Sequence, residues 1–482
     1  MDTVMAGIQW SLMLPEMVLA GLAVIILLID VFTGIRGSKP YLGIFSLIAL
    51  AASLILLHMD DSIGNIDSAF MLDPFSILFK TIILIGTALV ILLSMHYLRQ
   101  HPQVYQGEFY YLMLFAAAGA MVMVSSADLI TLYIGLEILS IASYCLAGFR
   151  KSHVKSSEAA MKYVILGGVS SAFILYGMSF VYGLTGSTSL PVIGYQMTDM
   201  YLNFSALTLM SLLFMVVGFG FKISSVPFHM WAPDVYEGAP TPVTAFIAVI
   251  SKVAAFAMML RLLSFGYSGV FGQWYVYIAI LAAVTMIVGN IAALTQNNVK
   301  RLMAYSGIAQ AGYLLVPVAA AITWDFAFSQ IFFYACAYLL MNLGVFAVIT
   351  VVTEDAKSEA IASFAGLHQR SPFLAFSMSV FLLSLAGLPV TAGFFGKFYI
   401  FLGVMTRGMY WLAAVMALTS ICSFYYYFSI IKQMYMQPTY RETLKAPFSL
   451  SVVVWFCLLG TLVLGVMPNL LTNFLNGVGW FM

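Results

Sequence analysis

Long apolar runs, each long enough to cross a lipid bilayer, recur along the whole 482-residue chain and leave no room for a soluble domain of ordinary size. A run of about 20 apolar residues is what an α-helix needs to cross the hydrocarbon core. The composition agrees, since 62% of the residues are hydrophobic and only 8% are charged. The sequence therefore predicts an all-α integral membrane protein, and its net charge of +1 gives no reason to expect a nucleic-acid partner.

The breaks between apolar runs divide the chain into about fourteen predicted transmembrane helices. Their expected bounds are 11–33, 41–58, 75–97, 109–126, 129–148, 160–184, 206–230, 242–263, 273–295, 302–321, 326–352, 373–404, 409–431 and 449–468. An even number of helices places both termini on one side. The odd-numbered loops hold thirteen Lys and Arg residues, against two in or beside the even-numbered loops. The positive-inside rule then makes the odd loops cytoplasmic and puts both termini on the outer face.

Five lysines fall inside predicted spans, where each costs about 2.5–3.5 kcal/mol unless it escapes or finds a polar partner. They are Lys80, Lys162, Lys222, Lys252 and Lys397. Lys80 lies near the start of its span, so snorkelling to the interface explains it, and for Lys162 snorkelling and a functional role are both open. Lys252 is the eleventh of the 22 residues from Pro242 to Leu263, which places it near mid-membrane and favours a functional role.

Two predicted spans are too long to be straight helices. At 1.5 Å per residue, 206–230 and 373–404 would extend about 38 Å and about 48 Å, against a hydrocarbon core of about 30 Å. Pro227 interrupts the first span, and Pro389 with its neighbouring glycines interrupts the second. Unpaired backbone at this depth requires protein or water to satisfy it, so both breaks predict a hydrated interior, with ordinary proline kinks as the alternative.

The two broken helices suggest an internal repeat. Each is the fourth helix of a five-helix unit, helices 4–8 and helices 9–13, and an odd number of helices inverts the second unit relative to the first. The expected divisions are 1–108 (an N-terminal three-helix segment), 109–265 and 266–435 (the two units), and 436–482 (a C-terminal helix). Glu137, inside the fifth span, is the acidic counterpart of the buried lysines.

Four segments carry a family resemblance. They read GLEILSIASYCLAGF around Glu137, FKISSVPFHMWAPDVYEGAPTPVTAFIAVISK at 221–252, KRLMAYSGIAQAGYLL from 300, and SLAGLPVTAGFFGKFYIF from 384. They closely resemble the subunit N family of NADH-quinone oxidoreductase, the antiporter-like membrane subunits of respiratory complex I. The resemblance covers essentially the whole chain and implies a multi-pass protein of the bacterial inner (plasma) membrane.

The resemblance also implies a role for matching residues. Glu137 would pair with Lys222, Lys252 would join them by way of a hydrated region near His229, and Lys397 would lead toward the opposite face. These residues would form a proton relay, through which electron transfer to quinone in partner subunits drives proton pumping. Lys162, from its position inside a predicted span, is a further candidate for this relay. Partners would be the sister antiporter-like subunits and small membrane subunits of the complex, within the lipid bilayer.

Redox chemistry is expected elsewhere. The sequence contains no glycine-rich nucleotide loop, no cysteine cluster and no haem-type pair of histidines. The electron donor (NADH or another carrier), FMN, iron–sulfur clusters and quinone would therefore belong to partner subunits, with no cofactor or metal bound by this chain.

One position departs from the family. Many members have histidine where this chain has Gln310, which cannot take up a proton. Two roles are open for Tyr305, Ser306 and Tyr313: with water they bridge the gap in the relay, or they only tie the tenth helix to its neighbours. A subunit of a multisubunit cation/proton antiporter remains the alternative function. A scaffold that conducts nothing is disfavoured, because leucine in place of the buried charges would stabilise it.

Overall fold

The computed structural model describes residues 9–34, 39–59, 63–66, 68–101, 106–439 and 441–480. The N-terminal helices are α2 (Leu14–Phe32), α3 (Pro40–Met59), α4 (Pro74–Gln100), α5 (Gln106–Val124), α6 (Leu129–Ala147) and α7 (Val154–Thr185). The central ones are α8 (Leu190–Ile223), α9 (Trp231–Gly238), α10 (Thr241–Phe246) and α11 (Lys252–Arg261). The remaining ones are α12 (Phe271–Ala293), α13 (Val299–Ala319), α14 (Trp324–Ala356), α15 (Leu367–Arg370), α16 (Pro372–Ala386), α17 (Ala392–Thr406), α18 (Tyr410–Met436), α19 (Phe448–Val466) and α20 (Asn469–Asn476).

The prediction of about fourteen membrane crossings is confirmed. Among the described residues, thirteen helical stretches are long and apolar enough to cross a membrane alone. Two more apolar helices, α16 and α17, have 15 residues each, which gives about 22 Å apiece at 1.5 Å per residue. Neither can cross alone, and together they supply the fourteenth crossing, which corresponds to the predicted broken span 373–404.

Both predicted helix breaks are present. The α8 helix ends at Ile223, with Ser224 in a left-handed conformation at φ +63°, and helical structure resumes only with α9 at Trp231. The α16 helix ends at Ala386, and Gly387 adopts φ +98° before α17 begins at Ala392. Left-handed backbone favours glycine because a Cβ atom is then strained. The two breaks thus expose carbonyl groups inside the protein, where side chains can bond to them.

The structure also contains elements that the apolar pattern does not predict. A short antiparallel hairpin, β1 (Gly64–Ile66) with β2 (Phe70–Leu72), precedes α4. The α8 helix starts at Leu190, well before the predicted start at 206, and is interrupted by non-helical dihedral angles at Phe204. The α11 helix lies between two π-helical segments, η2 (Ile247–Ser251) and η3 (Leu262–Gly266). Such segments are frequent at functional sites.

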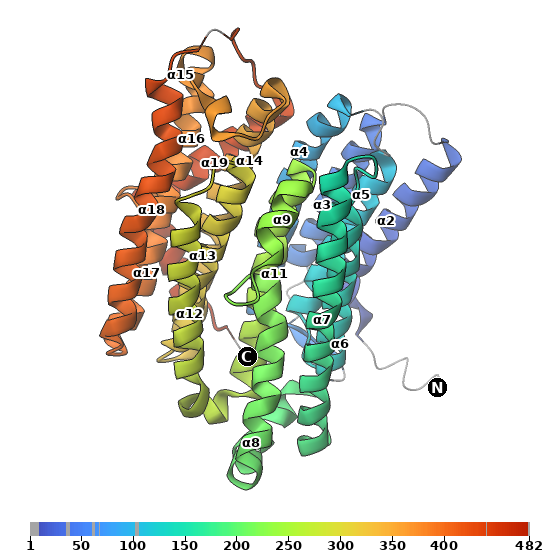
Figure 1. Ribbon diagram of the computed structural model, residues 1–482. Coiled ribbons are helices and arrows are strands. Elements are labelled where there is room, and N and C mark those ends of the chain that lie inside the picture. The colour runs from blue at the N-terminus through green and yellow to red at the C-terminus, as the bar shows by residue number, and fades with distance from the viewer. Residues whose placement is uncertain are drawn as a thin grey trace.

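The helices form two groups joined by a central column (Figure 1). In that view α2–α7 and α12–α19 lie on either side of α8, α9 and α11. The contacts agree, because α9 packs against both α7 and α13, and α11 packs against α5. Every residue from Thr241 to Leu263 is buried within the chain. The functional candidates therefore lie where the two groups meet.

Candidate functional site

Lys222 lies directly before the first helix break. It is the penultimate residue of α8, its side chain is buried, and its Nζ donates to Ser140 Oγ of α6 at 2.8 Å. The Tyr163 hydroxyl of α7 lies 3.5 Å from the same Nζ. Tyr163 also interacts electrostatically with the side chain of Ser251, the residue before Lys252. Two hydroxyl groups thus lead from one buried lysine toward the next.

Lys252 is buried at the start of α11, directly after the π-helical segment η2. Its Nζ donates to the Gly307 carbonyl of α13 at 2.7 Å and lies 5.9 Å from the centre of the Tyr338 ring. A Cβ atom at Gly307 would stand only 3.2 Å from Nζ, so the glycine makes room for this approach. The mid-chain lysine is therefore held by a backbone carbonyl rather than by a carboxylate.

Lys397 lies at the second helix break. Its Nζ donates to the Leu385 and Ala386 carbonyls at 2.8 Å and 3.1 Å, and it lies 4.5 Å from the centre of the Tyr313 ring. These carbonyls are free to accept because α16 ends there. The break and the lysine thus form one structural unit, in which the interrupted backbone supplies the acceptors.

Gln310 bridges the space between these two lysines. Its Nε2 donates to the Leu385 carbonyl at 3.1 Å, the same oxygen that accepts from Lys397. Its side-chain carbonyl accepts from the Tyr334 hydroxyl, and the Tyr427 hydroxyl, which pairs with Ser306, lies 3.5 Å from Nε2. Ser306 is adjacent to Gly307, the acceptor of Lys252. A chain of neutral polar groups therefore connects the surroundings of Lys252 with those of Lys397.

Glu137 differs from the lysines because it is only half-buried. It lines a groove of about 530 Å³ between α6 and α7, together with Tyr133, Tyr144 and apolar side chains. Its Oε1 accepts from Ser171 Oγ at 2.5 Å. The expected direct ion pair between Glu137 and Lys222 is absent. Lys222 bonds instead to Ser140, which lies on α6 with Glu137, and Glu137 and Lys222 still interact electrostatically.

His229 lies in the segment between α8 and α9 and is half-buried. Its Nδ1 has no hydrogen-bond partner among the described residues, while its backbone carbonyl accepts from Ala232 N. The structure thus places His229 in the first helix break, as the sequence suggests, but no protein group within hydrogen-bond distance of Nδ1 links it to Lys222 or Lys252.

Lys162 lies outside this buried set. Its side chain is 40% exposed and forms ion pairs with Glu158 at 2.7 Å and Asp234 at 2.6 Å. Asp234 also pairs with Arg301 at 2.7 Å, and Arg301 with Glu237 at 2.9 Å. These charges join α7, α9 and α13 in what we call the end network, formed by Lys155, Glu158, Lys162, Asp234, Glu237 and Arg301.

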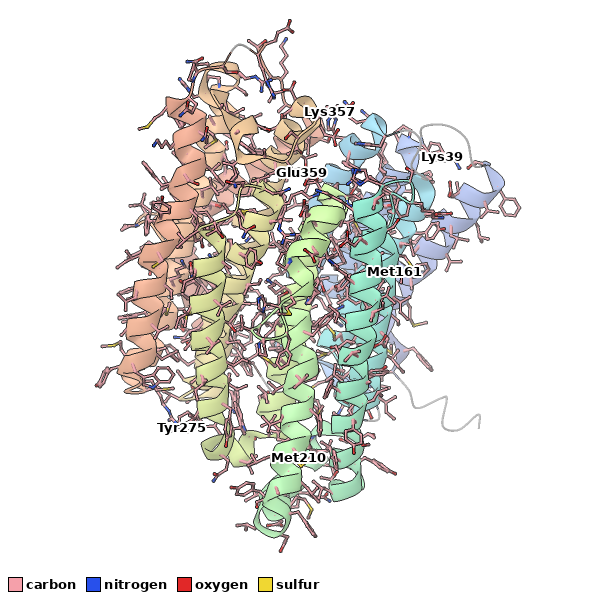
Figure 2. The ribbon with its side chains drawn as sticks, in the orientation of Figure 1. Lys39, Met161, Met210, Tyr275, Lys357 and Glu359 are labelled. Carbon is pink, nitrogen blue, oxygen red and sulfur yellow. The ribbon has the colours of Figure 1, made fainter. Side chains whose placement is uncertain are left out.

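An open cavity of about 630 Å³ lies at the same end of the molecule. Figure 2 labels Lys357 and Glu359 at this end, with Lys39, and Tyr275 and Met210 toward the opposite end. Both Lys357 and Glu359 line the cavity, as do Arg150, His153, Glu237 and Thr241. Burial, and then the nearby Arg150 cation, lowers the pKa of His153. The cavity is polar and contains groups of both charges.

Lys300 is a residue that sequence reasoning misplaced in a loop. Its side chain is buried, and Nζ donates to Glu359 Oε1 at 2.8 Å and to the Glu237 and Ala239 carbonyls, both at 2.9 Å. Glu237 and Glu359 line the cavity, so Lys300 lies directly behind the cavity wall. The Tyr236 hydroxyl, buried near Gly307, has no hydrogen-bond partner among the described residues.

Lys80 does not snorkel, which corrects the interpretation of its position near a helix end. Its side chain is 0% exposed, and Nζ lies 2.5 Å from Glu16 Oε1 of α2. Arg261, one of the two cations that the sequence places in or beside the even-numbered loops, is also 0% exposed and pairs with Asp73 at 2.8 Å. Neither partner could be identified from sequence, because Glu16 and Asp73 are 64 and 188 residues away from Lys80 and Arg261.

The described residues contain no group of three or more His, Cys, Asp or Glu side chains arranged to hold a metal ion. What the site offers is a row of buried amines, hydroxyls, an amide and backbone carbonyls. Such groups can pass protons when water joins them.

Known proteins share both the sequence and the fold. Residues 126–423 match the family model described as NADH:quinone oxidoreductase/Mrp antiporter, TM. The NADH-quinone oxidoreductase subunit N of Brevibacillus brevis is 45% identical over 488 residues, covering 97% of this chain and 95% of the relative. A chain of respiratory complex I from Thermus thermophilus with bound aureothin is 30% identical with a TM-score of 0.80, covering 95% of this chain and 98% of that one. A chain of the Mrp complex from a Dietzia species, 17% identical with a TM-score of 0.82 and 96% coverage of both chains, shares the fold.

Proposed function

This chain belongs to the NADH-quinone oxidoreductase subunit N family, and we propose that it translocates protons as a membrane subunit of a respiratory complex I. It is one subunit of a multisubunit redox-driven translocase. In this proposal electron transfer to quinone takes place in partner subunits and drives proton movement through the buried residues of this chain.

The observation that carries the proposal is the environment of three lysines. Lys222, Lys252 and Lys397 are each buried, and the described hydrogen-bond acceptors of their Nζ atoms are hydroxyls or backbone carbonyls, with no carboxylate among them. An ammonium group in an ion pair is held in its charged form by the opposite charge. An ammonium held only by neutral acceptors depends on its hydration and on distant charges, so it can release and regain a proton.

We propose that protons enter from the cavity at the end-network face. Glu359 and Glu237 line it, and Lys300 lies directly behind them. From there the unpartnered Tyr236 hydroxyl leads toward Gly307, where Lys252 is held. The missing hydrogen-bond partner of Tyr236 is a natural position for a water molecule, since buried polar groups are usually satisfied.

From Lys252 the route continues through Ser306, Tyr427 and Gln310 to Lys397. Glutamine cannot accept a proton, and its amide acts by orienting hydroxyl groups and water. The shared Leu385 carbonyl ties the Gln310 amide to the Lys397 ammonium. A change in the charge of Lys397 would therefore reorient Gln310. In this way the arrival of a proton at Lys397 would change the orientation of the polar groups that carry protons to it.

Glu137 and Lys222 form a second branch of the route, which meets the first at Lys252. We propose that Ser140, which accepts from Lys222, transmits the charge state of Glu137 to that lysine. Glu137 lines a half-open, mostly apolar groove between α6 and α7. A carboxylate in contact with lipid is unfavourable, so a neighbouring membrane subunit of the complex would cover this groove. His229 would contribute through water in the first break. Lys162 would contribute only by holding the end network together near the entrance.

The remaining parts of the proposal concern orientation and partners. The end that carries the cavity, Lys39 and Lys357 would face the cytoplasm of a bacterial inner membrane, with both termini on the outer face. Partners would be the sister antiporter-like subunits and small membrane subunits. NADH or another donor, FMN, iron–sulfur clusters and quinone would be bound by partner subunits, with no redox centre in this chain.

Purification through an affinity tag on this chain tests the function. The expected complex contains iron–sulfur and quinone-binding subunits and, in proteoliposomes, moves protons across the membrane when it reduces quinone. Copurification with membrane subunits alone, together with cation/proton exchange that needs no electron donor, would instead identify the antiporter alternative. That alternative now rests on the shared fold.

A further inference from the structure

A second buried lysine–carboxylate site lies away from the Glu137–Lys397 route. Lys80 of α4 and Glu16 of α2 lie 2.5 Å apart, with side chains 0% and 4% exposed. The contact lacks hydrogen-bond geometry, and neither Lys80 Nζ nor either carboxylate oxygen has another hydrogen-bond partner among the described residues. The Phe70 ring of the β1–β2 hairpin lies against the ammonium, 4.7 Å from Nζ to the ring centre.

The neighbouring ion pair shows how a structural pair is built in the same place. Arg261 donates to both carboxylate oxygens of Asp73, at 2.9 Å and 2.8 Å, and to the Val124 carbonyl at 3.0 Å. Asp73 also caps α4 by accepting from Ser76 N at 2.8 Å. Arginine cannot be deprotonated in proteins, so this pair keeps its charges.

The Glu16–Lys80 pair has neither the additional hydrogen bonds nor the permanent charge of the Asp73–Arg261 pair. A buried ion pair repays its desolvation only when further hydrogen bonds satisfy the remaining donors and lone pairs, and here none of the described groups does so. Both members can also change charge by gaining or losing one proton. The neutral amine with a carboxylic acid therefore competes with the charged pair far better here than it could at Asp73–Arg261.

The pair lies beside the β1–β2 hairpin and near the proton route. Glu16 lies in the first turn of α2, and Lys80 near the start of α4, at the face where the β1–β2 hairpin lies. Lys80 interacts electrostatically with Asp73 and Arg261. Arg261 is the last residue of α11 and Lys252 is its first, so one ten-residue helix links the two charge sites.

We propose that Glu16 and Lys80 form a second proton-binding site, which exchanges protons with the water at the hairpin face. This site deepens the proposed function and rests on it. The proton moves from Lys80 Nζ to a Glu16 oxygen, leaving a neutral amine and a carboxylic acid. The acid then releases the proton to water and the pair carries one negative charge, until a proton arriving from the membrane interior binds the amine.

Carbodiimide labelling of the intact complex tests the protonation step. Dicyclohexylcarbodiimide reacts with protonated carboxyl groups in apolar surroundings, and mass spectrometry locates the adduct. We expect labelling of Glu16 that increases during turnover, and none of Asp73, which keeps its charge beside Arg261. Absence of a Glu16 adduct both at rest and in turnover would mean a permanently charged pair and would overturn the proposal.

Removal of both charges tests the transport step. The double variant Glu16→Leu with Lys80→Met replaces the pair by apolar side chains of similar size, which a purely structural pair tolerates. In proteoliposomes we expect the assembled variant to translocate fewer protons per electron, with slower coupled turnover. Wild-type coupling would overturn the proposal, and labelling of Glu16 decides it should the variant fail to assemble. A wild-type complex that reduces quinone without moving protons would refute the proposed function instead.

Discussion

Lys162 and Lys252 lie in two contrasting environments, the end network and the buried interior. Lys162 in the network is 40% exposed and touches two carboxylates, Glu158 and Asp234, at 2.7 Å and 2.6 Å. Lys252 in the interior is 2% exposed, and its Nζ bonds to a backbone carbonyl at 2.7 Å. The distances are alike, and the difference lies in the charge of the acceptor.

That difference separates structural from proton-carrying roles. In the network each cation has a fixed countercharge from another helix, so the charges hold α7, α9 and α13 together. In the interior, burial disfavours the charged form of a lysine that has no fixed countercharge. Such a lysine loses its proton easily and can therefore carry protons. The comparison predicts that equal substitutions in the two regions will have unequal effects.

The largest effect is expected at mid-chain. Lys252→Met keeps the length of the side chain but removes the proton carrier, so coupled turnover should fall about 100-fold, the lower range for a proton-transfer group. The measurement is quinone reduction with proton movement in proteoliposomes. The matched control, Lys162→Met, should retain near wild-type turnover. Equal losses in the two variants would break the distinction between the regions.

Lys397→Ala should have a smaller effect. The carbonyls of Leu385 and Ala386 lie at a helix break and can bind water in place of the ammonium, so assembly should survive. We expect coupled turnover to fall by less than the roughly 100-fold loss of a proton-transfer group, because water can replace the ammonium. A variant complex that keeps the wild-type proton-to-electron ratio and rate would remove Lys397 from the route.

Substitutions of Gln310 sharpen the description of the interior. Leucine removes the partners of Tyr334, Tyr427 and the Leu385 carbonyl, so Gln310→Leu should slow coupled turnover about threefold to fivefold, which corresponds to roughly 1 kcal/mol, one hydrogen bond. Gln310→His, which keeps a donor and an acceptor, should be tolerated. Wild-type turnover in the leucine variant would place the proton route elsewhere.

The smallest effect on coupling is expected from Asp234→Asn. The amide weakens the ion pairs with Lys162 and Arg301, which are partly exposed, so the loss should be about 1 kcal/mol of stability. Thermal inactivation of the purified complex should occur at lower temperature, with the proton-to-electron ratio unchanged. A lower ratio at normal stability would show that the end network itself takes part in proton transfer.

Several features could be predicted from local sequence. The crossings follow from apolar length, and the breaks near Pro227 and Pro389 follow from proline and glycine in spans too long to be straight. The burial of Lys252 follows from its position midway along a span. These predictions succeed because each depends on residues close together in the chain.

The partners of the buried charges could not be predicted in the same way. The sequence places Lys80 near a helix end and Lys300 in a loop, where water normally solvates a lysine. Only packing brings Glu16 against Lys80, and Glu237 and Glu359 around Lys300. The expected Glu137–Lys222 contact fails for a related reason, since depth in the membrane does not say which side of α6 faces a given neighbour.

The sequence by itself determined an all-helical membrane protein with about fourteen crossings, two broken helices and ionisable groups at membrane depth. Hydrophobicity along the chain and the backbone chemistry of proline and glycine are sufficient for that. The tertiary structure alone decided which acceptor each lysine meets, because this depends on how helices far apart in sequence rotate and approach one another. For Lys162 and Lys252, the acceptor in turn separates a lysine that ties helices together from one that can pass on its proton.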